Sequence, residues 1–134
     1  PTGKLLPVAG TAFDFTKSEV IGSRLDQISR GGYDHAFVLA DKPQTKPSLA
    51  AEVYEPKSGR VMQILTDQPG IQLYTATYTT PLKGKNGAGY DRFHGLCLET
   101  QHHPDSVHHA EFPTTILRPG QTYRTTTIHQ FTTR

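Results

Sequence analysis

The feature that most constrains this fold is a succession of short apolar runs, separated by turns containing proline and glycine, over residues 36–131. Residues 49–54 alternate between two faces, a Pro-Lys-Ser-Gly turn follows at 56–59, and an apolar run returns over residues 61–65. Two runs joined by such a turn are typical of a β-hairpin. We therefore expect antiparallel strands in this part of the chain.

Further strands are expected on both sides of the hairpin. Ile71 and Leu73 share one face of an alternating stretch, while Gln72 and Tyr74 share the other. Threonine is frequent throughout, which suits half-buried pleated surfaces. The expected strands are residues 36–40, 71–75, 93–99 and 123–131, and the expected loops are residues 83–89 and 102–113.

One short helix is expected near residues 18–29. Thr16 and Glu19 have the spacing of a capping box, in which each side chain bonds the backbone N–H of the other residue. Ile21, Leu25 and Ile28 then follow at helical spacing before a glycine pair that ends the helix. The sequence therefore predicts an all-β chain with one short helix.

Composition excludes several classes of protein. Only 34% of the residues are apolar, which leaves little material for a core. The net charge of +2 comes without clustered Lys and Arg, which argues against a nucleic-acid-binding face. No apolar run approaches the length of about 18 residues that a membrane-spanning helix needs.

The single cysteine, Cys97, excludes an internal disulfide and fits a reducing compartment. We expect a cytoplasmic protein, although an extracellular one stays open because a secretion signal would lie upstream. Pro1 is not an initiator residue, so we expect the chain to begin inside a longer sequence.

Glu99 is the candidate base. It ends the apolar run Leu96-Cys97-Leu98, just before a polar loop that proline interrupts. We expect this position to be half-desolvated, which makes a carboxylate a stronger base than a free surface Glu. The alternative is a strand-end carboxylate that pairs with a nearby cation.

Two further polar residues are candidates for binding a hydroxyl-rich ligand. Asp34 follows a flexible diglycine, and its alternative role is to cap amides of the local turn. Gln72 can both donate and accept hydrogen bonds, and its alternative is a solvated strand face. Tyr74 shares that face, where it either lines the site or packs in the core. His35 is expected to be a structural neighbour of Asp34.

Four histidines gather in one polar loop around Asp105, at positions 102, 103, 108 and 109. A metal site would need several of them to converge, without a cysteine ligand, so the default interpretation is a solvated loop and no metal.

Several motifs occur in one order along the chain. They are GGYDHAF at 31–37, SGRV at 58–61, QPGIQLYT at 68–75, LCLETQ with PD at 96–105, and TILRPG at 115–120. Together they closely resemble the C-terminal part of the aldose 1-epimerase family, also called galactose mutarotases. The resemblance covers essentially all 134 residues.

This resemblance implies the fold, the reaction and the roles of three residues. Residues 1–134 would be the C-terminal part of a single domain with the galactose-mutarotase-like β-supersandwich fold. The family interconverts the α and β anomers of hexoses such as galactose and glucose without a metal or organic cofactor. It implies Glu99 as the general base, and Asp34 and Gln72 as residues that bind the sugar.

The family's acid is a histidine that lies upstream of the matching region. The resemblance therefore implies that the N-terminal part of the same protein, as a partner segment or second chain, supplies the acid, and that this chain alone is inactive. One alternative is a carbohydrate-binding protein without catalysis on the same scaffold. Another is a structural fragment without a sugar site, which the presence of both Asp34 and Glu99 disfavours.

Overall fold

The computed structural model describes residues 1–134, and it consists mainly of β-strands. Short 3-10 helices are the only helical segments, which confirms the all-β prediction. The strands are β1 (Asp34–Val38), β2 (Ser48–Glu55), β3 (Arg60–Thr66), β4 (Gly70–Tyr74), β5 (Leu82–Lys83), β6 (Gly89–Tyr90), β7 (Cys97–Gln101) and β8 (Thr127–Thr133). The 3-10 helices are η1 (Ile21–Gln27), η2 (Lys85–Gly87) and η3 (Ser106–His108).

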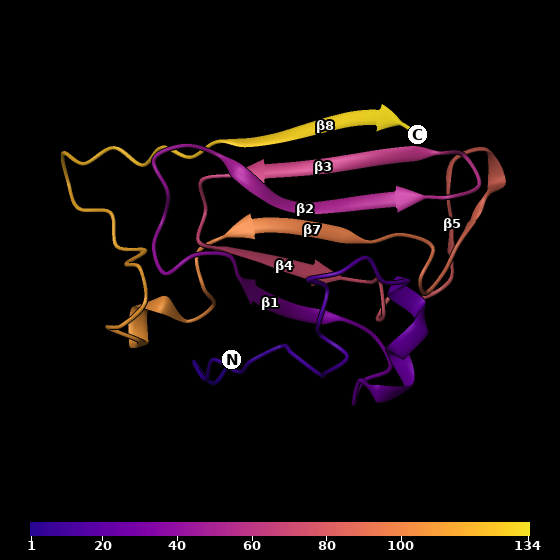
Figure 1. Ribbon diagram of the computed structural model, residues 1–134, viewed down its shortest axis with the longest axis horizontal. Helices are drawn as coiled ribbons and strands as arrows, with labels where there is room; N and C mark the ends of the chain where they lie inside the picture. Colours follow the sequence, from indigo (N-terminus) through magenta and orange to yellow (C-terminus); the bar gives the residue numbers. More distant parts are fainter. The chain divides into compact units, whose positions relative to one another are not determined.

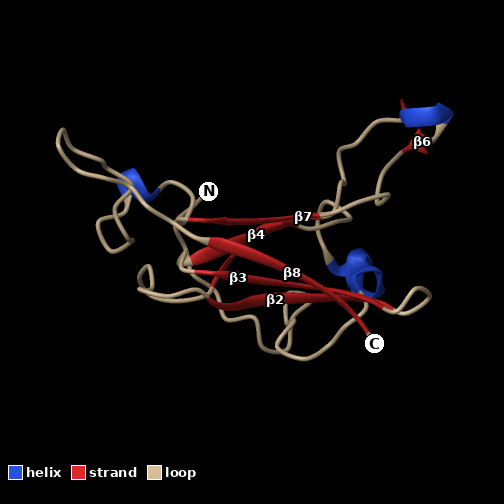
Figure 2. Ribbon diagram, turned by 90° about the horizontal axis from the view of Figure 1, so that it is seen from above, coloured by secondary structure: helices blue, strands red, loops and turns tan.

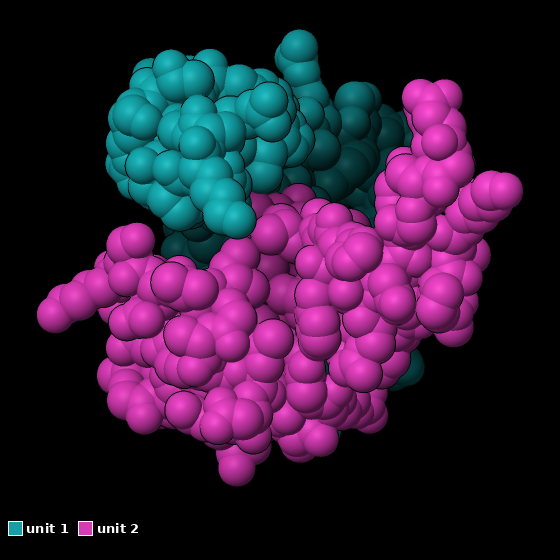
Figure 3. Space-filling view, turned by 90° about the vertical axis from the view of Figure 1, so that its right-hand side faces the viewer, with its two compact units in different colours: residues 1–3, 36–71, 99–134 teal, residues 4–35, 72–98 magenta.

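The chain divides into two compact units, coloured separately in Figure 3. Unit 1 contains residues 1–3, 36–71 and 99–134, and unit 2 contains residues 4–35 and 72–98. The strand order β1-β4-β7 forms a three-stranded sheet, and the boundary between the units falls within each of these strands. The expectation of a single domain stays a prediction.

Unit 1 contains an antiparallel sheet with the strand order β2-β3-β8 (Figure 1). The β2–β3 pair is the predicted hairpin, with Glu55 opposite Arg60 next to the turn and Tyr54 opposite Val61. The register shifts by one residue between Leu49 and Ala51. The alternating apolar residues and the turn between the two runs therefore predicted this hairpin correctly.

Within this sheet, burial is greatest on the central strand β3. Ile64 on β3 is only 1% exposed, and Thr66 at the end of β3 is equally buried. Leu49 and Phe131 on the two flanking strands are 57% and 72% exposed. Burial is concentrated on β3 because only a central strand has a neighbour on each side.

In unit 2, Tyr33 is fully buried and ties three segments together. Its hydroxyl donates to the Ala12 carbonyl oxygen over 2.6 Å, and its backbone N–H donates to Thr75 Oγ1 over 2.9 Å. Phe13 and Phe15 contact its ring edge-on. The start of β1 is therefore fixed beside the end of β4.

The expected helix exists as the shorter 3-10 helix η1, and the capping box does not form. Val20 is the N-cap and makes no side-chain cap. The Thr16 hydroxyl instead donates to Asp14 Oδ1 over 2.5 Å, within its own turn. Arg24 has φ −131° inside η1, which interrupts regular helical geometry. Local side-chain bonding outcompeted the capping motif here.

Three other element boundaries differ from the prediction. β7 begins at Cys97 rather than at residue 93, because Phe93 takes a left-handed conformation with φ 63°. The expected loop at residues 83–89 contains a small β5–β6 hairpin with η2 at its tip (Figure 2). Asn86 and Gly87, in the turn that joins the two strands, both have positive φ. β8 begins at Thr127 rather than at residue 123.

No helix of this structure is both long enough and apolar enough to span a bilayer.

We predict that Ile64→Ala destabilises the protein by about 2–5 kcal/mol, because it removes a buried side chain from the central strand and leaves a cavity. Leu49→Ala, which truncates an exposed side chain of the paired strand, should cost less than about 1 kcal/mol. Urea unfolding of both variants checks this. Equal losses for the two would show that burial in this sheet is not concentrated on β3.

Candidate functional site

Asp34 and Gln72, two of the predicted site residues, are in direct contact within unit 2. Gln72 Nε2 donates a hydrogen bond to Asp34 Oδ1 over 2.8 Å. Asp34 is exposed at the start of β1, and Gln72 is half-buried in the middle of β4. The hydrogen bond orients both side chains, and it leaves Asp34 Oδ2 and the amide oxygen of Gln72 as acceptors for a ligand.

The register of β1 and β4 explains this contact. Thr75 N–H donates to the Tyr33 carbonyl oxygen, and Leu39 N–H donates to the Pro69 carbonyl oxygen, so the numbering runs in opposite directions on the two strands. Asp34 is therefore opposite Tyr74, and Gln72 is its diagonal neighbour on the same face. Diagonal neighbours are within reach of a side chain as long as glutamine.

The opposite face of β4 is the buried one. Ile71 and Leu73 are 4% and 7% exposed, whereas Gln72 and Tyr74 are half-buried. This confirms the predicted alternation. The diglycine before β1 also has a packing role, because a Cβ at Gly32 would overlap the Thr77 side chain.

His35 supports the backbone of Asp34. The Asp34 N–H donates to His35 Nδ1 over 3.0 Å, so this nitrogen carries no proton. Phe13 contacts the imidazole edge-on, with ring centroids 4.7 Å apart. Burial lowers the pKa of His35 below its ordinary value, the Asp34 carboxylate opposes this, and Arg30 adds to the lowering. A neutral His35 therefore belongs to the arrangement around Asp34.

Tyr74, Tyr78 and Arg30 lie next to this pair, and sequence reasoning missed the last two. Tyr74 and Tyr78 stack with centroids 6.1 Å apart and an interplanar angle of 22°. Arg30 Nη1 donates to the Tyr78 hydroxyl over 3.2 Å. The only sequence feature that could have pointed to them is their position. Arg30 directly precedes the diglycine, and Tyr78 follows the strand that carries Gln72.

Glu99 lies in β7, within unit 1, and is exposed. The expectation that it is half-desolvated is wrong for this structure. The preceding run does not form a buried strand, since Leu96 and Leu98 are only half-buried and Cys97 is exposed. The convergence of Glu99 with Asp34 and Gln72 stays a prediction.

The histidine-rich loop was expected to be solvated, and this expectation is wrong for His103. His103 is 8% exposed and packs edge-on against Phe112. Burial lowers the pKa of His103, and His102 adds to the lowering. His108 contacts Asp105 over 2.5 Å, with His109 3.7 Å away from the same carboxyl group. No three His, Cys, Asp or Glu side chains come together in a geometry that could hold a metal ion.

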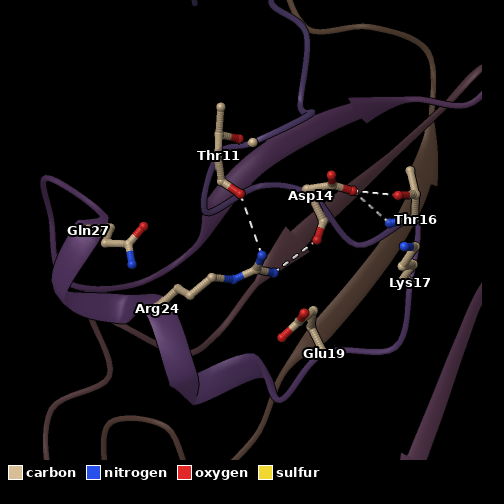
Figure 4. Close-up of a pocket in the computed structure, with 8 residues that line it drawn as sticks. Thr11, Asp14, Thr16, Lys17, Glu19, Arg24 and Gln27 are labelled. Carbon is tan, nitrogen blue, oxygen red and sulfur yellow. Dashed lines mark hydrogen bonds between the residues drawn. The ribbon is translucent and has the colours of Figure 1, made fainter.

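A polar pocket of about 320 Å³ lies beside η1 and is lined by residues between positions 10 and 27 (Figure 4). Arg24 spans it and donates to the carbonyl oxygens of Asp14 and Thr11 over 3.0 and 3.5 Å. Its guanidinium also lies over the Phe15 ring. The Thr16 hydroxyl holds the pKa of Asp14 below its usual range. Arg24 thus holds the turn before η1, and neither Asp34, Gln72 nor Glu99 lines this pocket.

Comparison with known proteins decides the family. A model of the aldose 1-epimerase family matches residues 1–130. The chain belongs to the aldose 1-epimerase family. Galactose mutarotases of Mus musculus and Homo sapiens are 46% and 45% identical to it over 132 residues, and aldose 1-epimerase of Escherichia coli (strain K12) is 35% identical over 137 residues.

Each of these alignments covers 98% of the chain, which itself spans 38–39% of the length of the family members it matches. The crystal structure of the GalM/aldose epimerase homologue from C. elegans superposes with a TM-score of 0.81 at 28% identity. That match covers 99% of this chain and 40% of the other. The predicted fold of the aldose 1-epimerase family is thereby confirmed.

We predict that acid weakens the protein partly through His35. Its folded pKa is below the unfolded value of about 6.5, so the unfolded chain binds more protons as the pH falls through this range. The free energy of unfolding should therefore decrease from about pH 7.5 to about pH 5. His35→Asn, whose side-chain oxygen can still accept the Asp34 N–H, should reduce this decrease in urea unfolding.

His129→Asn is the matched control, because His129 is an exposed histidine on β8, in unit 1. An unchanged pH dependence in His35→Asn, or an equal change in His129→Asn, would contradict the assignment. Part of the dependence should survive in His35→Asn, since His103 shifts in the same direction.

Proposed function

We propose that this chain is part of an aldose 1-epimerase that interconverts the α and β anomers of hexoses such as galactose and glucose. The observation that carries the proposal is the Asp34–Gln72 contact, which puts a carboxylate and an amide side by side on the solvent-facing side of a strand pair. Clustered acceptors and donors of this kind suit a ligand covered with hydroxyl groups.

The reaction needs only proton transfer and one bond broken and reformed. A base removes the proton from the C1 hydroxyl while an acid protonates the ring oxygen. The bond between C1 and the ring oxygen breaks, which gives the open-chain aldehyde. Rotation about C1–C2 and reclosure on the other face reverse both transfers, so no proton is gained or lost overall.

Glu99 is proposed as the base. Its carboxylate belongs to β7, the strand next to β4 in the sheet order, and its exposure leaves it accessible to a substrate. Asp34 and Gln72 are proposed to fix the sugar by its other hydroxyls. Holding the reacting hydroxyl near the base converts an encounter between separate molecules into an intramolecular step.

The acid is proposed to be a histidine outside these 134 residues, on a further segment of the same protein. The basis is the resemblance, which carries no acid onto the histidines of this chain. His35 in particular uses Nδ1 to accept the Asp34 N–H, and Phe13 packs against its ring. This assigns His35 a supporting role rather than proton transfer to the sugar.

We predict that Glu99→Gln in the complete protein lowers the rate of mutarotation by about two to four powers of ten while sugar binding is largely retained. The amide keeps the shape of the side chain but cannot accept the proton. Polarimetry measures the rate, and calorimetry measures the affinity for galactose.

Glu111→Gln is the control, because Glu111 is an exposed carboxylate in the histidine-rich loop. A near-normal rate for Glu99→Gln would exclude Glu99 as the base. A wild-type protein that binds galactose without accelerating mutarotation would favour the carbohydrate-binding alternative.

A further prediction concerns the proposed acid. Residues 1–134 alone should not accelerate anomer interconversion, because no positioned donor protonates the ring oxygen. Adding the proposed segment should restore the rate, which polarimetry measures on the chain with and without it. Mutarotation by residues 1–134 alone at enzyme-like rates would show that the acid is within this chain.

A further inference from the structure

The strand that carries the proposed base is paired on one side only. β7 is the last strand in the order β1-β4-β7, so β4 is its single neighbour in the sheet. The Glu99 side chain is exposed, and its carboxylate makes no ion pair or side-chain hydrogen bond within these 134 residues. The direction of the carboxylate therefore depends on how firmly β7 itself is held.

The inner face of β7 supplies a second attachment through Thr100. Successive side chains of β7 alternate between the two faces, with Glu99 exposed and Thr100 half-buried. The Thr100 hydroxyl bonds the Thr127 hydroxyl over 2.7 Å, and both residues belong to unit 1. Thr127 is the first residue of β8, in the β2-β3-β8 sheet, so this bond joins the two sheets at the residue that follows Glu99.

Thr127 is in turn bonded to the buried end of β3. Its hydroxyl lies 3.2 Å from the hydroxyl of Thr66, a residue that is 1% exposed. Thr66 donates to the Thr126 carbonyl oxygen over 3.3 Å and accepts the Gln68 N–H over 3.1 Å. Because the carbonyl oxygen can only accept, the Thr66 proton is used there, and Thr127 and Thr100 donate in turn toward Thr66. Each hydroxyl in such a chain strengthens the next bond.

Asp67 fixes the far end of this hydroxyl chain. Its two carboxylate oxygens accept the Thr126 N–H over 3.1 and 2.9 Å, and one of them also accepts the Thr125 hydroxyl over 2.6 Å. Hydrogen bonds to a carboxylate are stronger than those between neutral groups. The start of β8 is therefore held against the end of β3, which makes the Thr127 hydroxyl a fixed point to which β7 can bond.

We propose that Thr100 and Thr127 are positioning residues for Glu99, and that their hydroxyl bond holds β7 so that the carboxylate meets the C1 hydroxyl of the sugar. This inference rests on the proposed function and adds residues that act through Glu99 rather than on the sugar. A base must lie within hydrogen-bond reach of the proton that it removes, and a displacement of about 1 Å can cost about a hundredfold in rate. Loss of the bond should slow proton removal without weakening sugar binding by Asp34 and Gln72.

The experiment removes the bond from each side in the complete protein. Thr100→Val and Thr127→Val each replace the hydroxyl by a methyl group and keep a β-branched side chain. Polarimetry with galactose gives kcat and KM. Each variant should lower kcat about ten- to a hundredfold and leave KM within about twofold, the pattern of an interaction that matters only in the transition state. The double variant should be no slower than the slower single variant, because both substitutions remove the same bond.

Two further variants separate the hydroxyl from other effects. Thr100→Ser keeps the hydroxyl and should retain at least about half of the wild-type kcat. Thr114→Val is the matched control, because Thr114 is an exposed threonine of unit 1 whose hydroxyl oxygen accepts the Ile116 N–H over 3.2 Å, and it should leave kcat unchanged. Thermal unfolding shows that each variant is folded at the assay temperature. If one valine variant does not fold, the other tests the same bond from the opposite strand.

Unchanged kcat in both Thr100→Val and Thr127→Val would overturn the positioning role and leave the proposed function intact. A rise in KM with kcat unchanged would show that the bond supports sugar binding instead. Thr100→Ser as slow as Thr100→Val would show that packing of the methyl group, and not the hydroxyl, is what matters. A wild-type protein that does not accelerate mutarotation would overturn both the positioning role and the proposed function.

Discussion

The buried side chain of Tyr33 is the interaction on which the Asp34–Gln72 site depends. It has no exposed surface, and its hydroxyl satisfies the Ala12 carbonyl oxygen while its backbone N–H and carbonyl oxygen are bonded to Thr75. The bonds to Thr75 fix one end of the β1–β4 register, which places Asp34 within reach of Gln72. A slip of one residue would turn Asp34 toward the buried face.

The two faces of the β1–β4 pair thus have different tasks. Ile71, Leu73 and His35 lie on the inner face, where packing and the neutral imidazole hold the backbone in place. Asp34 and Gln72 lie on the outer face, where they remain available to a ligand. Successive side chains of a strand point to opposite faces of the sheet. One residue can therefore pack in the interior while its neighbour in the sequence binds a ligand.

The sequence predicts the strands and their buried faces correctly wherever the alternation of apolar residues agrees with the packing in the folded chain. The β2–β3 hairpin and the two faces of β4 follow from alternation and turn residues. The predicted capping box does not form, because the Thr16 hydroxyl bonds Asp14 instead. The predicted partial burial of Glu99 was wrong because Glu99 shares the exposed face of β7 with Cys97. The contact between Tyr78 and Arg30 could not be predicted from the sequence. It depends on the left-handed conformation of Ala76, for which the sequence around Ala76 contains no recognisable signal.

The outer strand of the β2-β3-β8 sheet has a consequence for handling the protein. β8 pairs only with β3, and its residues Thr127–Thr133 include no lysine, arginine, aspartate, glutamate or proline. In a sample of residues 1–134 by themselves, the backbone N–H and C=O groups on the outer edge of β8 can therefore pair with a strand of another molecule, and the exposed ring of Phe131 adds apolar contact. Concentrated samples should lose material to intermolecular strand addition, and a lysine placed in β8 on the solvent side should slow that loss.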